Sequence, residues 1–389
     1  MSLPGEGNEL LKVYHKDVHH EKNHIRFNNV DELTRHLLAS TGVTYTSTCI
    51  SKPEDHQELL CWHVEDALHS LQKLITNTNI SACDLTPHTV YDQAGNRVYA
   101  SLQHGLDFEL VNKDLSPGEL CIPYSLFSDG SVIAMGKTSF HSVVIKAPAL
   151  DMSQYDQPWA HILASLNPQL QERPEHGLVD GSYMFRLRKR EILHQCLDIV
   201  LKPLKAIQYT GFFCTPAGYL SVRRCYPWLA FASVDLLEAW TLANLKNGKD
   251  LYSKITPAEV PLRYRDDCGA LVIRDSAAIN VCADEGASVL ACGGTKARCI
   301  EICDPEDTWP LKSALRDLRW VDSLQCISVA DVLHQDYAGV GLELLQVLLY
   351  DMKVTFGRRH KKKVATVNTR LRELGNMSGV KLPSNVSKV

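Results

Sequence analysis

The sequence lacks the features that mark membrane and secreted proteins. Its longest apolar stretches, such as Leu342–Leu349, are much shorter than the roughly 20 residues that a bilayer-spanning helix needs. The first residues, MSLPGEGNELLKVYHKD, have no basic start followed by an apolar stretch, as a secretory signal would. We therefore expect an intracellular protein with no membrane partner.

The common nucleotide-binding and hydrolase motifs are also missing. There is no GxGxxG or GxxxxGK[ST] phosphate loop and no GxSxG nucleophile elbow. The 13 cysteines include no Cys-x-x-Cys pair, which disfavours zinc and iron–sulfur sites. They are odd in number and scattered, unlike those of a disulfide-stapled domain. We therefore expect reduced core thiols, no cofactor and no metal site.

One formal metal pattern is present near the beginning of the chain. His20-Glu21-Lys22-Asn23-His24 has the HExxH spacing that, on a buried helix, binds zinc between the two histidines. Lys22 and Asn23 are polar where such a helix is buried, and no third ligand follows at helical spacing. Adventitious metal binding by this His-rich stretch is the alternative to a catalytic site.

The charge is distributed unevenly. The net charge is −4, yet Lys353–Val389 holds ten Lys or Arg residues and a single acid, Glu373. An acidic body with a basic extension is typical of proteins that meet nucleic acid or an acidic partner. Apolar residues make up 45% and charged residues 22%, which is ordinary for a globular protein.

The order of the expected elements favours an α+β fold over a doubly wound sheet, because helices and strands do not alternate steadily. We predict a helix that begins at Ser51 and ends near Ile75, another over 182–201 closed by Pro203, and a turn at Asp129-Gly130. Short β-like segments predict an antiparallel meander over about 259–304, followed by a helical C-terminal part. With 389 residues we expect an α/β domain (1–150), an α+β domain (175–350) and a basic helical tail (353–389).

Basic clusters are the first candidates for a binding site. Nucleic-acid affinity depends on neutralised phosphates, and arginines beside aromatic residues such as Tyr226 and Trp228 suit base stacking. A solvated charge run or a nuclear signal is the alternative explanation. The candidate residues are Arg358, Arg359, Lys361, Lys362, Lys363, Arg370, Arg372, Arg186, Arg188, Lys189, Arg190, Arg223 and Arg224.

A second candidate is the HxxxDG pattern from His176 to Gly181. It resembles the catalytic signature of the chloramphenicol-acetyltransferase-like acyltransferases. The resemblance implies a CoA-dependent acyl transfer in which His176 is the general base and Asp180 maintains local geometry. Histidine suits the base role because its imidazole titrates near neutral pH. Otherwise the segment is a turn that precedes the helix at Ser182.

The sequence thus predicts a non-enzymatic protein that binds nucleic acid, specifically RNA, through its basic C-terminal segment. We also expect it to self-assemble as a homo-oligomer, like a viral nucleoprotein. An acidic protein surface is the alternative partner. The alternative functions are an acyltransferase and an interaction scaffold without nucleic acid. We expect a cytoplasmic location, or a nuclear one directed by Arg358–Lys363.

Overall fold

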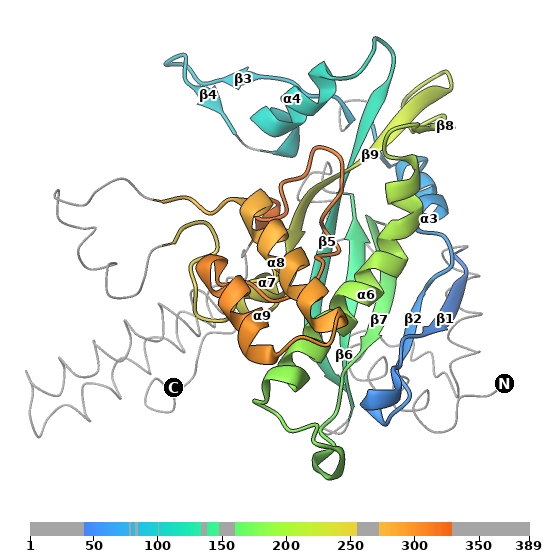
Figure 1. Ribbon diagram of the computed structural model, residues 1–389. Coiled ribbons are helices and arrows are strands. Elements are labelled where there is room, and N and C mark those ends of the chain that lie inside the picture. The colour runs from blue at the N-terminus through green and yellow to red at the C-terminus, as the bar shows by residue number, and fades with distance from the viewer. Residues whose placement is uncertain are drawn as a thin grey trace, which may run out of the picture. The chain divides into compact units, whose positions relative to one another are not determined.

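The computed structural model describes residues 43–77, 79–81, 85–99, 101–133, 138–147, 160–254 and 272–328 (Figure 1). All of them lie in the first of the two units into which the chain divides, Met1–Val329. They form helices and an eight-stranded mixed sheet, which confirms the predicted α+β class. The division into domains at 150–175 stays a prediction, and the expected tail at 353–389 lies outside the described residues.

The sheet runs in the order β1-β2-β7-β6-β5-β9-β10, and β8 pairs with β9. Neighbours from β1 to β5 are antiparallel, whereas β5, β9 and β10 are mutually parallel. The strands are β1 (Tyr45–Cys49), β2 (Leu60–Val64), β5 (Leu120–Ile133), β6 (Thr138–Lys146), β7 (His161–Pro168), β8 (Phe212–Cys214), β9 (Arg223–Ser233) and β10 (Ile327–Ser328). A separate hairpin consists of β3 (Val90–Tyr91) and β4 (Arg97–Val98).

The longest helix, α6, lies across the sheet (Figure 1). Its start is set by Ser182, whose hydroxyl accepts a hydrogen bond from the Phe185 amide, as an N-cap residue does. The helices are α3 (Ala67–Ile75), α4 (Leu106–Lys113), α6 (Tyr183–Ile207), α7 (Leu236–Leu242), α8 (Ser276–Ala291) and α9 (Lys296–Cys303).

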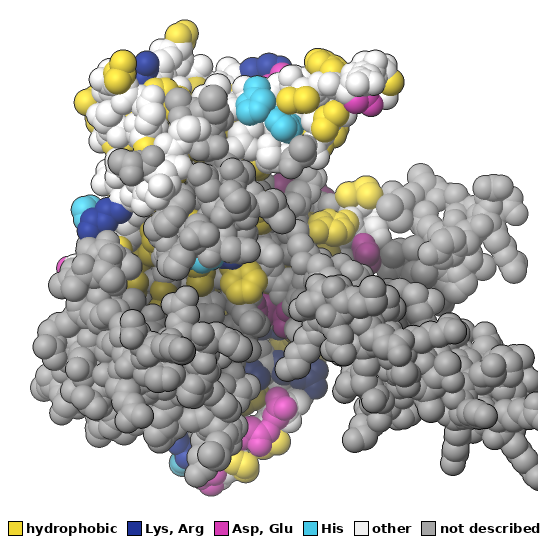
Figure 2. Space-filling model, turned by 180° about the vertical axis from the view of Figure 1, so that it is seen from behind, with side chains coloured by type: hydrophobic (Ala, Val, Ile, Leu, Met, Phe, Trp, Pro, Cys, Tyr) yellow, Lys and Arg dark blue, Asp and Glu magenta, His cyan; other side chains and the backbone are white. Residues whose placement is uncertain are grey.

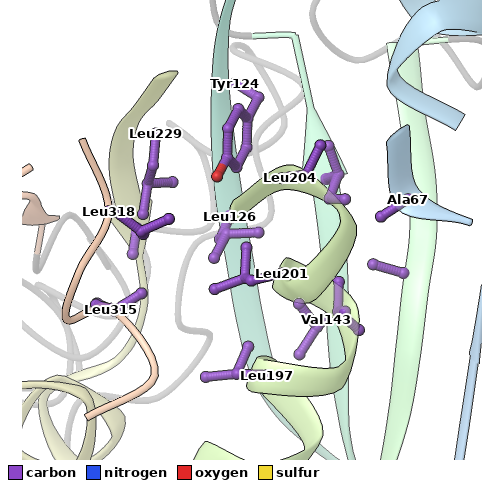
Figure 3. Packing of buried hydrophobic residues seen from close by; sticks show 14 of the residues in the cluster. Ala67, Tyr124, Leu126, Val143, Leu197, Leu201, Leu204, Leu229, Leu315 and Leu318 are labelled. Atoms are coloured by element: carbon purple, nitrogen blue, oxygen red, sulfur yellow. The ribbon is translucent and has the colours of Figure 1, made fainter. Parts of the chain in front are cut away.

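The central strand β5 is buried on both faces. Tyr124 and Leu126 belong to the main core, where they meet Leu197 and Leu201 of α6 (Figure 3). Because side chains alternate along a strand, Cys121 belongs to the other face, where it packs with the α4 residue Phe108. The described side chains thus cover both faces of β5 as far as Ser128.

Several local predictions are wrong. The predicted meander fails because α8 and α9 occupy most of the described part of 259–304. The helix predicted from Ser51 to Ile75 is confirmed only in its second half, as α3 (Ala67–Ile75). Leu60–Val64 is instead a strand, which pairs with both β1 and β7. Residues 310–318, expected to be helical, form turns and irregular structure.

Two boundary predictions also fail. Pro203 does not close α6, which continues to Ile207 with the proline inside it. Asp129-Gly130 is not a turn, because β5 continues through it to Ile133 while paired with β6. The remaining predicted C-terminal helices lie outside the described residues.

Candidate functional site

Two aspartates lie at the same level of adjacent parallel strands. Phe127 of β5 pairs with Ser233 of β9, and Asp129 and Asp235 each follow two residues later. Asp129 is still in β5, opposite Ser142 of β6, while Asp235 precedes α7. Ligand sites in α/β sheets form outside the carboxyl ends of parallel strands. We call Asp129, Asp235 and the neighbouring Glu238 the acidic sheet end.

Glu238 is a buried carboxylate with only part of its hydrogen bonding satisfied. Glu238 is 5% exposed, and its Oε1 accepts a hydrogen bond from His141 Nδ1. Its Oε2 is buried and has no hydrogen-bond partner among the described residues. A buried carboxylate is costly unless it is paired, so an external cation or donor would account for this oxygen.

Asp235 also has a structural role. Its Oδ1 accepts a hydrogen bond of 2.7 Å from the Glu238 amide, which caps α7. Capping occupies one oxygen of Asp235. Helix capping therefore explains neither the burial of Glu238 nor the presence of a second aspartate at the same level of the neighbouring strand.

His141 orients the Glu238 carboxylate from the neighbouring strand β6. A carboxylate oxygen can only accept, so the ring must donate from Nδ1 to Glu238 Oε1. In the neutral ring this fixes Nε2 as the unprotonated nitrogen. His141 lies opposite Gly130, next to Asp129 in β5.

A cavity of about 360 Å³ adjoins this site and has a basic rim. Asp235, Glu238 and His141 line it together with residues of α6. Among them, Arg186 and Lys189 are exposed, lie three residues apart on one helix face, and make no ion pair within the described part of the chain. A cavity lined by carboxylates, with unpaired cations at its edge, is suited to binding a phosphate group together with a metal ion.

The other two cations predicted on α6 are occupied inside the protein. Arg188 is 6% exposed and donates to both oxygens of Asp55 at 2.8 and 2.6 Å. Arg190 is 7% exposed, donates to Thr241 and Asn247, and lies over the Trp309 ring. Burial lowers the pKa of Arg190 to about 10. These two arginines therefore position α6 and are not available to a ligand.

The remaining basic candidates divide into two groups. Arg223 and Arg224 lie at the start of β9, at the opposite end of that strand from Asp235. The candidates Arg358, Arg359, Lys361, Lys362, Lys363, Arg370 and Arg372 lie outside the described residues, as does the HExxH stretch.

The HxxxDG residues do not form one site. His176 ends a short 3-10 helix, Pro174–His176, and its ring stacks on His56 with centroids 3.8 Å apart. Asp180 is exposed, and its amide donates to Glu172. The two residues line different cavities, so the segment is a turn before α6.

Neither aspartate of the acidic sheet end was among the residues predicted from the sequence. Asp129 was assigned to a turn because an Asp-Gly pair is a strong turn signal. A usable signal exists: two nearly continuous apolar runs, residues 120–127 and 225–232, each lead within three residues to an aspartate. Such runs are typical of strands buried on both faces, whose ends carry function.

Within the described residues, no helix is long and apolar enough to cross a bilayer. No group of three or more His, Cys, Asp or Glu side chains arranged for a metal ion was found, and the side chain of Asp129 is not among those described.

A family model described as Plavaka transposase matches residues 23–341. No curated protein matches. The family match contradicts the predicted RNA-binding nucleoprotein, acyltransferase and interaction-scaffold functions, because a transposase mobilises DNA. The more general prediction of a nucleic-acid partner holds, since a transposase binds DNA.

Proposed function

Because the chain belongs to the Plavaka transposase family, we propose that it breaks and joins DNA phosphodiester bonds at the acidic sheet end. Moving a DNA segment requires that phosphodiester bonds be cut and new ones formed. The observation that supports this site most strongly is the common level of Asp129 and Asp235 on adjacent parallel strands, beside the buried Glu238.

The acidic sheet end fits a divalent metal ion. Mg²⁺ and Mn²⁺ prefer carboxylate oxygens, and Glu238 Oε2 is a buried carboxylate oxygen without a partner among the described residues. Asp129, Asp235 and Glu238 would hold the ion. When bound, such ions stabilise the attacking and leaving oxygens of an in-line phosphoryl displacement.

The protein's own side chains supply orientation and charge. His141 fixes the Glu238 carboxylate through its Nδ1 hydrogen bond. Arg186 and Lys189 at the cavity rim can bind the non-bridging oxygens of the DNA phosphate, which offsets the repulsion between DNA and the carboxylates. The Asp55–Arg188 ion pair fixes the part of α6 that carries these two cations.

Nicking of supercoiled plasmid DNA by the full chain with Mg²⁺ or Mn²⁺ tests this proposal. Asp129→Asn and Asp235→Asn keep the side-chain size but remove the charge. We expect each to reduce the nicking rate by about a hundredfold or more, because several kcal/mol of charge stabilisation are lost.

Asp180→Asn is the matched control. Asp180 lines the same cavity but is exposed and distant from the strand ends in sequence. It should nick at the wild-type rate. Wild-type nicking by both Asp129→Asn and Asp235→Asn, or equal loss in Asp180→Asn, would refute the proposed site.

A further inference from the structure

Arginine and aromatic side chains alternate at the start of β9 in a continuous contact series. The Arg224 guanidinium lies 5.7 Å from the centre of the Phe213 ring and 5.8 Å from that of Tyr226. Arg319 then lies 5.4 Å from Tyr226 and 5.5 Å from Tyr209. Arg319 also stacks on Trp320 at 3.7 Å. We call these six residues the arginine–aromatic ladder.

The ladder ends in two exposed rings. Phe213 is 69% exposed and Tyr209 is 68% exposed, while Tyr226 between them is buried. The rings come from β8 and from the turn after α6, at the β8–β9 end of the sheet (Figure 1). Figure 2 shows hydrophobic side chains around basic ones at this upper end of the molecule. Exposed aromatic rings offer a free face on which a base can stack.

The ladder carries positive charge that the described residues do not fully balance. Among the described residues, Glu119 is the one carboxylate within ion-pair distance of its arginines, at 3.8 Å from Arg224, and it also accepts a hydrogen bond from the Tyr226 hydroxyl. Asp114 accepts a hydrogen bond of 2.9 Å from Trp320 Nε1. Arg319 makes no ion pair within the described residues, and its Nη1 donates to the Gln208 carbonyl. Further donors of Arg319 and Arg224 remain for an anionic partner.

We propose that the arginine–aromatic ladder binds an unpaired DNA strand. Bases would stack on Phe213 and Tyr209, and phosphates would pair with Arg224 and Arg319. Base stacking on aromatic rings beside a positive surface is the general mode of single-strand binding. A duplex fits less well, because its bases are stacked on one another and present no free face to the rings.

This surface is separate from the acidic sheet end. Arg224 lies at the amino end of β9, whereas Asp235 follows the carboxyl end of the same strand. The ladder therefore provides a second DNA contact that does not depend on metal or catalysis. It would hold a strand that has separated from its complement during cutting and joining.

Fluorescence anisotropy in EDTA, with the full chain and a labelled oligothymidylate of about 15 nucleotides, measures this binding directly. We expect Phe213→Ala and Tyr209→Ala each to weaken single-strand binding about 5- to 100-fold, as the loss of one stacked base predicts. Binding to a duplex of the same length should change by less than about twofold. Phe213→Trp, which keeps a stacking surface, should bind as tightly as wild type.

Tyr99→Ala is the matched control. Tyr99 is 59% exposed and lies 5.3 Å from the Arg97 guanidinium, but it is not part of the ladder. It should bind the oligonucleotide normally. Unchanged single-strand affinity in both Phe213→Ala and Tyr209→Ala, an equal loss of duplex binding, or an equal loss in Tyr99→Ala would overturn the proposal. Because the assay contains no metal, its failure leaves the nicking site untouched.

Discussion

Asp55 and Arg188 form the buried charge pair that positions the basic face of α6. Asp55 is 0% exposed and receives two hydrogen bonds from the Arg188 guanidinium and one from the Lys52 amide. Arg188 also contacts Glu191, which in turn pairs with Lys52. This network links the segment before β2 to the helix that carries Arg186 and Lys189.

Asp55→Asn should destabilise the fold by about 3–5 kcal/mol, because the guanidinium of Arg188 is left buried without its main counter-charge. Chemical denaturation at neutral pH measures this loss. Asp180→Asn, at an exposed position, should change the unfolding free energy by less than about 0.5 kcal/mol. An equal effect of the two substitutions would contradict a structural role for the pair.

The same residue predicts how stability depends on pH. Burial by itself raises the pKa of Asp55, but the hydrogen bonds and charges of Arg188 and Lys52 hold the pKa below its ordinary value of 3.8. A carboxyl with a lowered folded-state pKa stabilises the fold above its unfolded-state pKa, and this contribution is lost as the pH falls through the folded-state pKa.

Wild type should therefore lose unfolding free energy below about pH 4, and the difference between wild type and Asp55→Asn should shrink there. Denaturation curves at several pH values measure the difference. A gap that stays constant between neutral pH and pH 3 would show that the charge of Asp55 contributes nothing.

At the scale of elements, α6 and the central strands form the frame of the molecule. Leu197 and Leu201 are 1% and 0% exposed and face Leu126 and Val143 in the main core (Figure 3). This packing fixes β5 and β9 relative to one another, and with them the level of Asp129 and Asp235. The candidate site thus depends on a helix that contributes none of its carboxylates.

Leu201→Ala should destabilise the protein by about 2–5 kcal/mol, because it removes buried methyl groups and leaves a cavity. Lys202→Ala, on the exposed side of the same helix, is the control for helix propensity and should be nearly neutral. Thermal or denaturant unfolding distinguishes them. A Leu201→Ala protein as stable as wild type would mean that α6 does not hold the sheet.

The elements predicted correctly are those with strong local signals. The helix predicted to begin at Ser182 does so, because the Ser182 hydroxyl caps α6. The failure at α8 has a packing cause. Gly286 lies in the segment predicted to be a meander, and a Cβ there would lie 2.6 Å from Cys303 Sγ, so glycine permits α8 and α9 to approach closely. The contact joins residues of two different helices and therefore leaves no local pattern in the sequence.

The candidate site could be predicted only in part for a related reason. Arg186 and Lys189 were found because they are basic and close in sequence. Asp129 and Asp235 are 106 positions apart and become neighbours only through the parallel pairing of β5 with β9. Long-range parallel pairing leaves no local pattern that marks two distant residues as a pair.

At the scale of the whole molecule, the basic residues of the C-terminal segment should add duplex affinity. Replacing Arg358, Arg359, Lys361, Lys362 and Lys363 with glutamine should weaken duplex binding and reduce the magnitude of the slope of log K against log salt by up to about 4–5, since each phosphate contact contributes about 0.9. Anisotropy titrations at several salt concentrations measure this slope. An unchanged slope would exclude these residues from DNA binding.

The nuclear location predicted from the same residues suits a protein that acts on DNA.

The central claim is that Asp129 and Asp235 belong to a single metal site, and Mn²⁺ titration calorimetry on the full chain tests it most directly. Wild type should bind Mn²⁺ with measurable heat, and Asp129→Asn, Asp235→Asn and the double variant should lose affinity to a similar extent. The double variant should lose less than the two single losses combined, because both residues serve one ion. Wild-type Mn²⁺ affinity in both single variants would contradict the account.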